Sequence, residues 1–142
     1  MAQKRLSDDE FRGLLKKFYK DVDINRDNFE SKILEPPKLY VKYRKLYFDQ
    51  RRLLININSD IKKALKKADH YYMFDYDYKL STKSDREIQI EGDDAMVELR
   101  IEYERQSDIV DFLKGALKEI SDLGYKIHSY IDYMKLKNGI MT

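Results

Sequence analysis

The sequence predicts a mainly α-helical chain with one small β-hairpin, an α+β fold forming a single domain over all 142 residues. Apolar residues recur every three or four positions in residues 37–72 and again in 108–138, which is the spacing of amphipathic helices. Residues 86–104 instead alternate apolar and polar side chains, as half-buried strands do. The composition, 38% charged and 42% hydrophobic, is typical of a helix-rich protein.

Several classes of function are disfavoured by what the sequence lacks. It has no cysteine for a disulfide or a thiolate site, no run of 18 apolar residues, and no apolar stretch near its start that would indicate a secretory signal. His70 and His128 have no partner at metal-ligand spacing, and the five glycines are scattered rather than gathered in a phosphate loop. We therefore expect no enzyme, no metal site and no cofactor.

The first predicted elements are short helices within residues 7–35. Ser7 and Glu10 form a capping box, and an amphipathic helix then runs to about Lys20 on the apolar face of Phe11, Leu14, Leu15 and Phe18. Residues 21–32 alternate oxygen-bearing side chains as a calcium loop does, but Arg26 and Lys32 occupy the glycine and glutamate positions. A turn in which Asp27 caps a short helix is the better interpretation.

The central prediction is one long basic helix over residues 37–72. Pro36 and Pro37 separate it from the preceding segment, and Pro37 suits a first helical turn. The β-branched segment near Asn58 leaves a break there possible, although continuity or a mild kink is favoured. One face is apolar, and the opposite face would form a basic stripe roughly 35 Å long. That stripe holds Arg44, Lys45, Arg52, Lys62, Lys63, Lys66 and Lys67.

The remainder is predicted as a loop at 73–85, the hairpin at 86–104 and C-terminal helices at 108–138. Residues 91–94 have the composition of a turn between two strands. The first C-terminal helix would end at Gly124, and Gly115 inside it indicates close approach by a neighbour. We expect the apolar face of this helix and the hairpin to make subunit contacts. The residues predicted for assembly are Ile109, Phe112, Leu113, Gly115, Leu117 and Ile120.

Charge is distributed unevenly along the chain. Residues 36–69 hold ten basic and three acidic side chains, a net +7, whereas residues 86–142 hold eight basic and twelve acidic ones, a net −4. The cluster from Lys62 to Lys67 is followed by His70, Tyr71 and Tyr72, which suits phosphate neutralisation and base stacking on single strands. Tyr72 continues the apolar face and is better interpreted as a core residue.

Four motifs, in this order and spacing, resemble the UvsY family of phage recombination mediators from about Asp21 to Gly139. They are residues 39–43 (LYVKY), Ala64-Leu65-Lys66 with Tyr71-Tyr72, residues 111–117 (DFLKGAL) and residues 124–127 (GYKI). The family's DNA-binding signature has a lysine, a small residue, an arginine and then two tyrosines. Lys66, Tyr71 and Tyr72 match it, whereas Lys67 and Ala68 stand at the small and arginine positions, and the loop after Tyr72 is shorter and lacks the family's glycines.

The resemblance implies a ring-like homo-oligomer, a hexamer or heptamer, that acts in the cytoplasm of an infected bacterial host and not at a membrane. It would bind single-stranded DNA and load a RecA-like phage recombinase onto DNA covered by the phage single-strand-binding protein. The residues predicted to contact DNA are Arg44, Lys45, Arg52, Lys62, Lys63, Lys66, Lys67 and Tyr71. Two alternatives stay open: a structural or assembly module of a phage that uses the basic helix to bind an acidic protein, and a nonspecific binder of duplex DNA or RNA.

Overall fold

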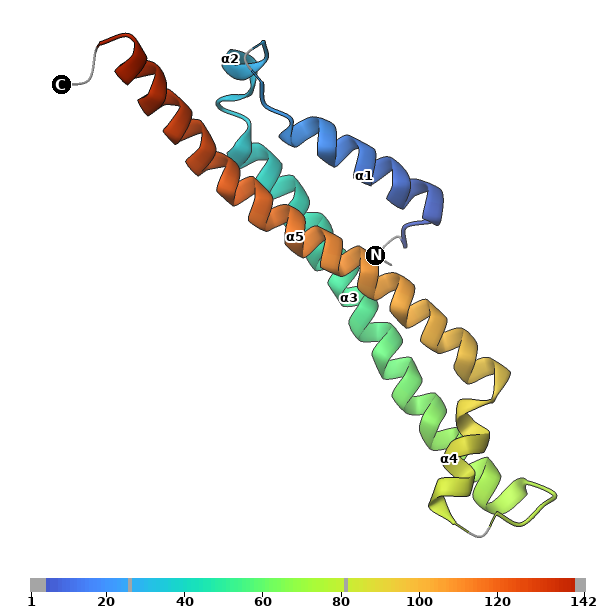
Figure 1. The fold of residues 1–142 in the computed structure, drawn as a ribbon. Coiled ribbons are helices and arrows are strands. Elements are labelled where there is room, and N and C mark those ends of the chain that lie inside the picture. Colours follow the sequence, from blue (N-terminus) through green and yellow to red (C-terminus); the bar gives the residue numbers. More distant parts are fainter. Residues whose placement is uncertain (1–4, 26, 81, 140–142) are drawn as a thin grey trace. The chain divides into compact units, whose positions relative to one another are not determined.

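A computed structural model describes residues 5–25, 27–80 and 82–139, and this part of the chain is almost entirely helical. Figure 1 shows its elements in chain order. They are α1 (Asp8–Val22), α2 (Phe29–Lys32), α3 (Pro36–His70), the π-helical turn η1 (Tyr71–Asp75), α4 (Lys83–Glu91) and α5 (Asp94–Lys137). The chain divides into two compact units. Unit 1 comprises residues 1–49 and 111–142, and unit 2 comprises residues 50–110, as far as these are described.

The predicted β-hairpin at residues 86–104 is wrong, because the structure has helices there and no strand in its described part. Helix α4 begins where the Thr82 hydroxyl accepts a hydrogen bond from the Asp85 amide at 3.1 Å, and the Asp93 carboxylate accepts one from the Ala95 amide at 3.0 Å where α5 begins. The buried side chains are Ile90 and Met96, whereas the alternating Ile88 is exposed. A lone hairpin is marginally stable, and helices bury these two side chains without leaving strand edges unpaired.

The C-terminal helices predicted at 108–138 are also different, because α5 is one helix that starts before Asp108 and passes Gly124 without ending. A Cβ atom added at Gly115 or Gly124 would meet nothing within 4 Å, so no neighbouring part of the described chain packs closely against either glycine. The helix persists because its buried residues keep a spacing of three or four throughout, which outweighs about 1 kcal/mol for each interior glycine. These residues are Leu113, Ala116, Ile120, Leu123 and Ile127.

Helix α3 is one unbroken helix from Pro36 to His70, so the break considered near Asn58 is not seen. It begins at Pro36, which is buried, one residue before the expected start. Residues 36–49 belong to unit 1 and residues 50–70 to unit 2. No helix in the described ranges is long and apolar enough to cross a membrane.

Unit 1 has an aromatic core between α1, the start of α3 and the later part of α5. The Phe18 ring contacts Tyr43 edge-on, with 5.3 Å between centroids, and Phe112 edge-on at 5.4 Å. Phe11 contacts the same Phe112 ring at 5.6 Å. The Ser7 hydroxyl accepts a hydrogen bond from the Glu10 amide at 3.1 Å, as the capping box predicts. Edge-to-face packing of this kind adds to the stabilisation from burial.

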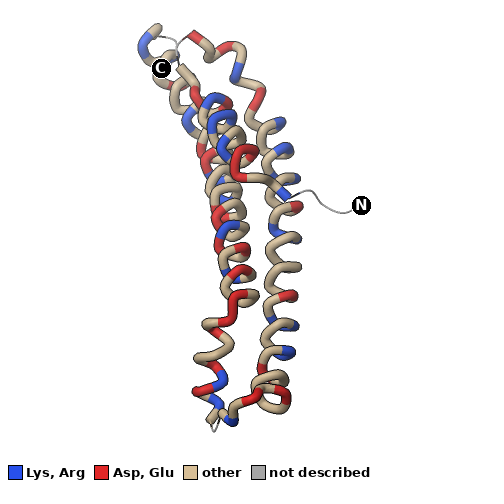
Figure 2. The backbone as a smooth tube through the Cα atoms, turned by 90° about the vertical axis from the view of Figure 1, so that its right-hand side faces the viewer, with Lys and Arg blue, Asp and Glu red and all other residues tan. Residues whose placement is uncertain are grey.

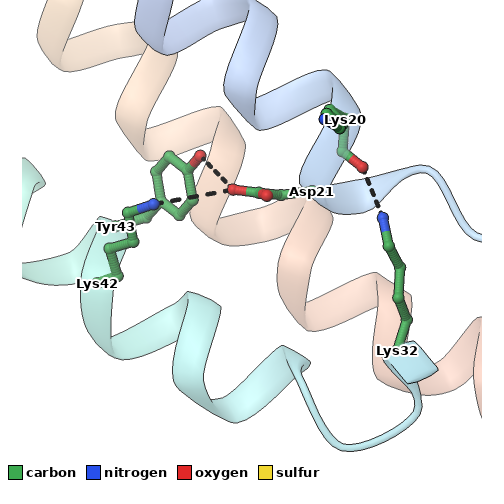
Figure 3. A network of polar contacts seen from close by, with 5 residues as sticks. All are labelled: Lys20, Asp21, Lys32, Lys42 and Tyr43. Carbon is green, nitrogen blue, oxygen red and sulfur yellow. Dashed lines mark hydrogen bonds and ion pairs between the residues drawn. The ribbon is translucent and has the colours of Figure 1, made fainter.

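Polar contacts in unit 1 hold two of its lysines, Lys32 and Lys42, against acceptors (Figure 3). The Asp21 carboxylate accepts a hydrogen bond from the Tyr43 hydroxyl at 3.2 Å and lies 3.9 Å from the Lys42 ammonium. Lys32 donates to the Lys20 carbonyl at 2.7 Å and so satisfies an acceptor at the end of α1. A hydrogen bond with the Lys17 side chain, together with burial, lowers the pKa of Lys42, while Asp21 acts in the opposite direction.

The loop between α1 and α2 is stabilised by hydrogen bonds of its two asparagines. The Asn25 side chain accepts from the amides of Asp27 at 2.9 Å and Asn28 at 3.1 Å, and the Asn25 amide donates back to the Asn28 side chain at 2.8 Å. Asn28, not Asp27, is therefore the residue that precedes the short helix. Arg26 lies outside the described residues, and no group of potential ligands suited to a metal ion occurs among those described.

Unit 2 has a thinner core that includes a buried polar pair. Ile57, Ile90, Met96, Ile109 and Val110 supply its buried apolar side chains. The fully buried Gln106 donates from Nε2 to both the backbone oxygen and the side-chain oxygen of Gln50, each at 2.9 Å. Arg86 on α4 binds Asp69 at 3.1 Å, which ties α4 to the end of α3.

Candidate nucleic-acid interface

All seven cations predicted to contact DNA are exposed on α3. Arg44 and Lys45 lie in unit 1, and the other five lie in unit 2. Within the described ranges, none of the seven has a carboxylate at ion-pair distance. Arg44 lies over the Phe48 ring at 5.5 Å, so its guanidinium already has an aromatic partner. Figure 2 shows the basic turns of α3 as blue segments of the tube.

The structure brings three of the predicted lysines together. Lys63, Lys66 and Lys67 line an open surface groove of about 480 Å³, and His70 completes its wall. The reason is local: positions 63, 66, 67 and 70 are separated by three, four and seven residues and so share one face of an α-helix. Among the residues that the structure describes, no acidic side chain lines this groove. Three ammonium groups around one open groove form a site for an anion with several charges.

Four tyrosines follow this groove in the sequence; Tyr71 and Tyr78 are exposed, and Tyr72 and Tyr76 are partly buried. Beyond His70 the backbone makes a π turn, closed by the Tyr76 amide donating to the Tyr71 carbonyl at 2.9 Å. Ring contacts run from Tyr71 to Tyr72 at 5.0 Å, on to Tyr76 at 4.9 Å and then to Tyr78 at 5.7 Å between centroids. Single-strand binding surfaces combine such rings with cations, because every base has a face that can stack.

The two tyrosines of the predicted motif differ in exposure. Tyr71 keeps 47% of its surface exposed, whereas Tyr72 is partly buried and its hydroxyl lies 3.5 Å from the Asp93 carboxylate. Burial, and then the charge of Asp93, raises the pKa of Tyr72. The structure therefore places Tyr71 where it can contact a ligand and Tyr72 where it anchors the turn.

Two exposed residues beside the groove were missed by sequence reasoning, which treated 73–85 only as a loop. The Phe74 ring is 67% exposed and packs against the His70 ring at 4.9 Å between centroids. Asp75 lies 3.8 Å from His70 and brings a negative charge to the same edge. One feature of the sequence could have predicted Phe74 beside the groove. It lies four residues after His70 and eleven after Lys63, so it continues the helical spacing of the lysines.

Three of the six residues predicted for assembly are buried within the chain itself. Ile109, Leu113 and Ile120 are between 0% and 2% exposed, Phe112 and Leu117 are partly exposed, and Gly115 is exposed. A subunit contact through this set is therefore limited to Phe112, Gly115 and Leu117, and the role in assembly stays a prediction. Unit 2 has other exposed apolar side chains, namely Ile55, Ile88, Val97 and Ile101.

The fold and the groove together define a class: a helical protein whose distinctive surface is a row of unpaired cations beside exposed aromatic rings. Residues 17–140 match the family described as "Recombination, repair and ssDNA binding protein UvsY". The chain therefore belongs to the UvsY family, which confirms the resemblance seen in the motifs.

Solved structures agree with this assignment at the level of the fold. The chain is similar to crystal structures of the bacteriophage T4 recombination mediator protein UvsY in two lattice types. One has a TM-score of 0.78 at 20% identity and covers 89% of this chain and 98% of that chain. Another has a TM-score of 0.78 at 22% identity and covers 95% and 98%. No curated protein sequence matches the chain.

Proposed function

We propose that this protein is a recombination mediator that binds single-stranded DNA through the groove of Lys63, Lys66, Lys67 and His70 on α3. The observation that carries the proposal is the absence of acidic partners for these lysines, within the described residues, beside exposed aromatic rings. Membership of a family described as binding single-stranded DNA supports it.

Binding follows from the charge and shape of a single strand. Its phosphates enter the open groove, where the lysine ammonium groups replace the condensed counterions. Lysines act as point charges on flexible stems and so accept phosphates in many positions, which favours binding without sequence preference. Arg52, Lys62 and the ring of Tyr71 extend the contact along unit 2, and Arg44 and Lys45 add contacts from unit 1.

The mediator role requires only that two proteins competing for the same strand differ in their affinity for the form in which this protein holds it. We infer that a homo-oligomer, a hexamer or heptamer, presents many copies of the groove, so that weak single contacts add to a high avidity. A strand held in a form that suits a RecA-like recombinase better than the phage single-strand-binding protein shifts their exchange, with no hydrolysis by this chain. The exposed apolar side chains of unit 2, among them Ile88, Val97 and Ile101, support assembly. The proposed setting is the cytoplasm of an infected bacterial host.

Fluorescence anisotropy with a labelled oligonucleotide tests the proposed site. For a single strand, log K falls with log salt by about 0.7 for each phosphate neutralised. Changing Lys63, Lys66 and Lys67 together to Ala is expected to weaken binding at low salt and to reduce this slope by about 2. The matched control changes the exposed lysines Lys16, Lys114 and Lys118 of unit 1 to Ala, which removes the same charge from other helices.

The two variants separate the site from the overall charge. An equal loss in both would show that net charge alone drives binding, and an unchanged slope in the α3 variant would exclude the groove. If the unaltered protein binds no oligonucleotide at any salt concentration, the alternative of a module that binds an acidic protein replaces this proposal. Competition with duplex DNA and RNA tests the preference for single-stranded DNA.

A further inference from the structure

We propose that Phe74 is a base-stacking residue that receives an unpaired base from a strand whose phosphates occupy the lysine groove. This inference rests on the proposed binding of single-stranded DNA and adds to it a residue outside the predicted binding set. The juxtaposition that carries it is an exposed ring packed directly against His70, which is itself part of the groove wall.

The position of Phe74 suits a ligand contact better than a structural one. Its ring is 67% exposed, and the one ring contact recorded for it among the described residues is with His70, at 4.9 Å and an interplanar angle of 53°. By contrast, Phe18 in unit 1 is 2% exposed and contacts three other rings. A phenylalanine left largely in water contributes little to folding, so its apolar surface remains for a partner to cover.

The turn that presents Phe74 is anchored from behind. Tyr72 is partly buried, with its hydroxyl 3.5 Å from Asp93, and it also contacts the Tyr76 ring at 4.9 Å. The Tyr76 amide closes the π turn on the Tyr71 carbonyl at 2.9 Å. Because residues on both sides of Phe74 are held, its ring is presented without first ordering a flexible loop, which reduces the entropy lost on binding.

The charges around Phe74 indicate which part of a nucleotide it meets. His70 and the three lysines line the groove and attract phosphate. Asp75, which lies 3.8 Å from His70 at the edge of the groove, and Asp77, which follows it closely in the sequence, are exposed and repel it. A base is uncharged and is separated from its phosphate by one sugar. A strand with its phosphates at the lysines can therefore bring a base to Phe74 while keeping its backbone away from the aspartates.

The first test measures affinity for an oligonucleotide of deoxythymidines at several salt concentrations. Phe74→Leu keeps apolar bulk but removes the stacking face, and it is expected to weaken binding by between about fivefold and a hundredfold. The salt slope should stay unchanged, because no cation is lost, in contrast to the lysine variant. Tyr19→Ala, which removes another exposed ring from unit 1, is the matched control and should leave binding unaltered.

The second test uses the absence of tryptophan from the sequence. Phe74→Trp places a single tryptophan at this position, and stacking on a base is expected to quench its fluorescence. An oligonucleotide of equal length with abasic sites carries the same phosphates and should bind with much weaker quenching. Tyr19→Trp, at an exposed position of unit 1, should show no change with either strand.

The outcomes distinguish this inference from the proposed function. Oligonucleotides could bind with the expected salt slope while Phe74→Leu binds as tightly as the unaltered protein and Phe74→Trp shows no quenching. This result would overturn stacking on Phe74 and leave the proposed binding site of the lysines intact. Equal quenching by abasic and ordinary strands also overturns stacking. If the unaltered protein binds no strand, the proposed function and this inference fail together.

Discussion

The two units of this protein use the same kinds of side chain for different ends. In unit 1 aromatic rings interlock in the core, and two of the lysines are held, Lys42 by Asp21 and Lys32 by backbone oxygens at the end of α1. In unit 2 the aromatic rings from Tyr71 to Tyr78 extend to the surface. Its lysines at 63, 66 and 67 line an open groove to which no carboxylate of the described residues contributes.

The difference shows which side chains stabilise the fold of each unit and which remain available to a ligand. A buried ring or a paired cation stabilises its own fold and is lost to a ligand, whereas an exposed ring and an unpaired cation contribute little to stability and keep their full interaction for a partner. Unit 1 therefore has the surface of a structural element, and unit 2 has that of a binding element. Substitutions in the two units should separate stability from affinity.

The largest expected effect compares two phenylalanines, one from each unit. Phe18→Ala removes a ring that is 2% exposed and leaves a cavity among Tyr43 and Phe112, so we expect a loss of about 3–5 kcal/mol in the free energy of unfolding. Phe74→Ala removes a ring that is 67% exposed and should change stability by less than about 0.5 kcal/mol. Urea denaturation of both variants measures the two losses in free energy of unfolding. Equal losses would contradict the distinction between the two units.

A smaller effect is expected from Tyr43→Phe in the polar network of unit 1. It removes the hydrogen bond from the buried hydroxyl to Asp21 and should cost about 1.5–3 kcal/mol near pH 8, since the acceptor is charged. Burial, and then the charge of Asp21, raises the pKa of Tyr43 above its ordinary value of 10.0. The unfolded chain therefore releases this proton first, and the stabilisation is lost as the pH rises above 10.

The pH dependence gives this variant its own control. Tyr43→Phe should lose less stability than the unaltered protein between pH 8 and pH 11, so the difference between their free energies of unfolding should narrow. Urea denaturation at the two pH values measures it. Parallel curves over this range would show that the Tyr43 proton is not linked to folding.

The smallest effect is expected from Asp75→Asn beside the groove of unit 2. It removes a carboxylate that lies 3.8 Å from His70 and repels phosphate. Because both side chains are more than 60% exposed, the change in oligonucleotide affinity should be an increase of up to about fivefold at low salt, fading as salt rises. Titrations at two salt concentrations measure it, and weaker binding by Asp75→Asn would show that this edge does not face the strand.

Local patterns predicted α3 well and the segment after it poorly. The spacing of Leu54, Ile57 and Ile61 distinguishes an apolar face over many turns, so the helix and its exposed lysines can be predicted without knowledge of any distant contact. Residues 86–104 offer only short stretches that alternate with period two, and this pattern favours strands over helices. Burial of Ile90 and Met96 decided between these alternatives, and neither burial is visible in local spacing.

The sequence by itself determined the elongated basic helix, the grouping of Lys63, Lys66 and Lys67, and the family, because each depends on helical periodicity or on motifs read along the chain. Only the tertiary structure decided that residues 86–104 are helical, that α5 passes Gly124, and that Phe74 stands exposed beside the groove. The continuity of α5 depends on which of its residues are buried, and the other two features depend on contacts between residues far apart in sequence, such as Tyr72 with Asp93 and Arg86 with Asp69. Such contacts outweigh the local preferences of short segments.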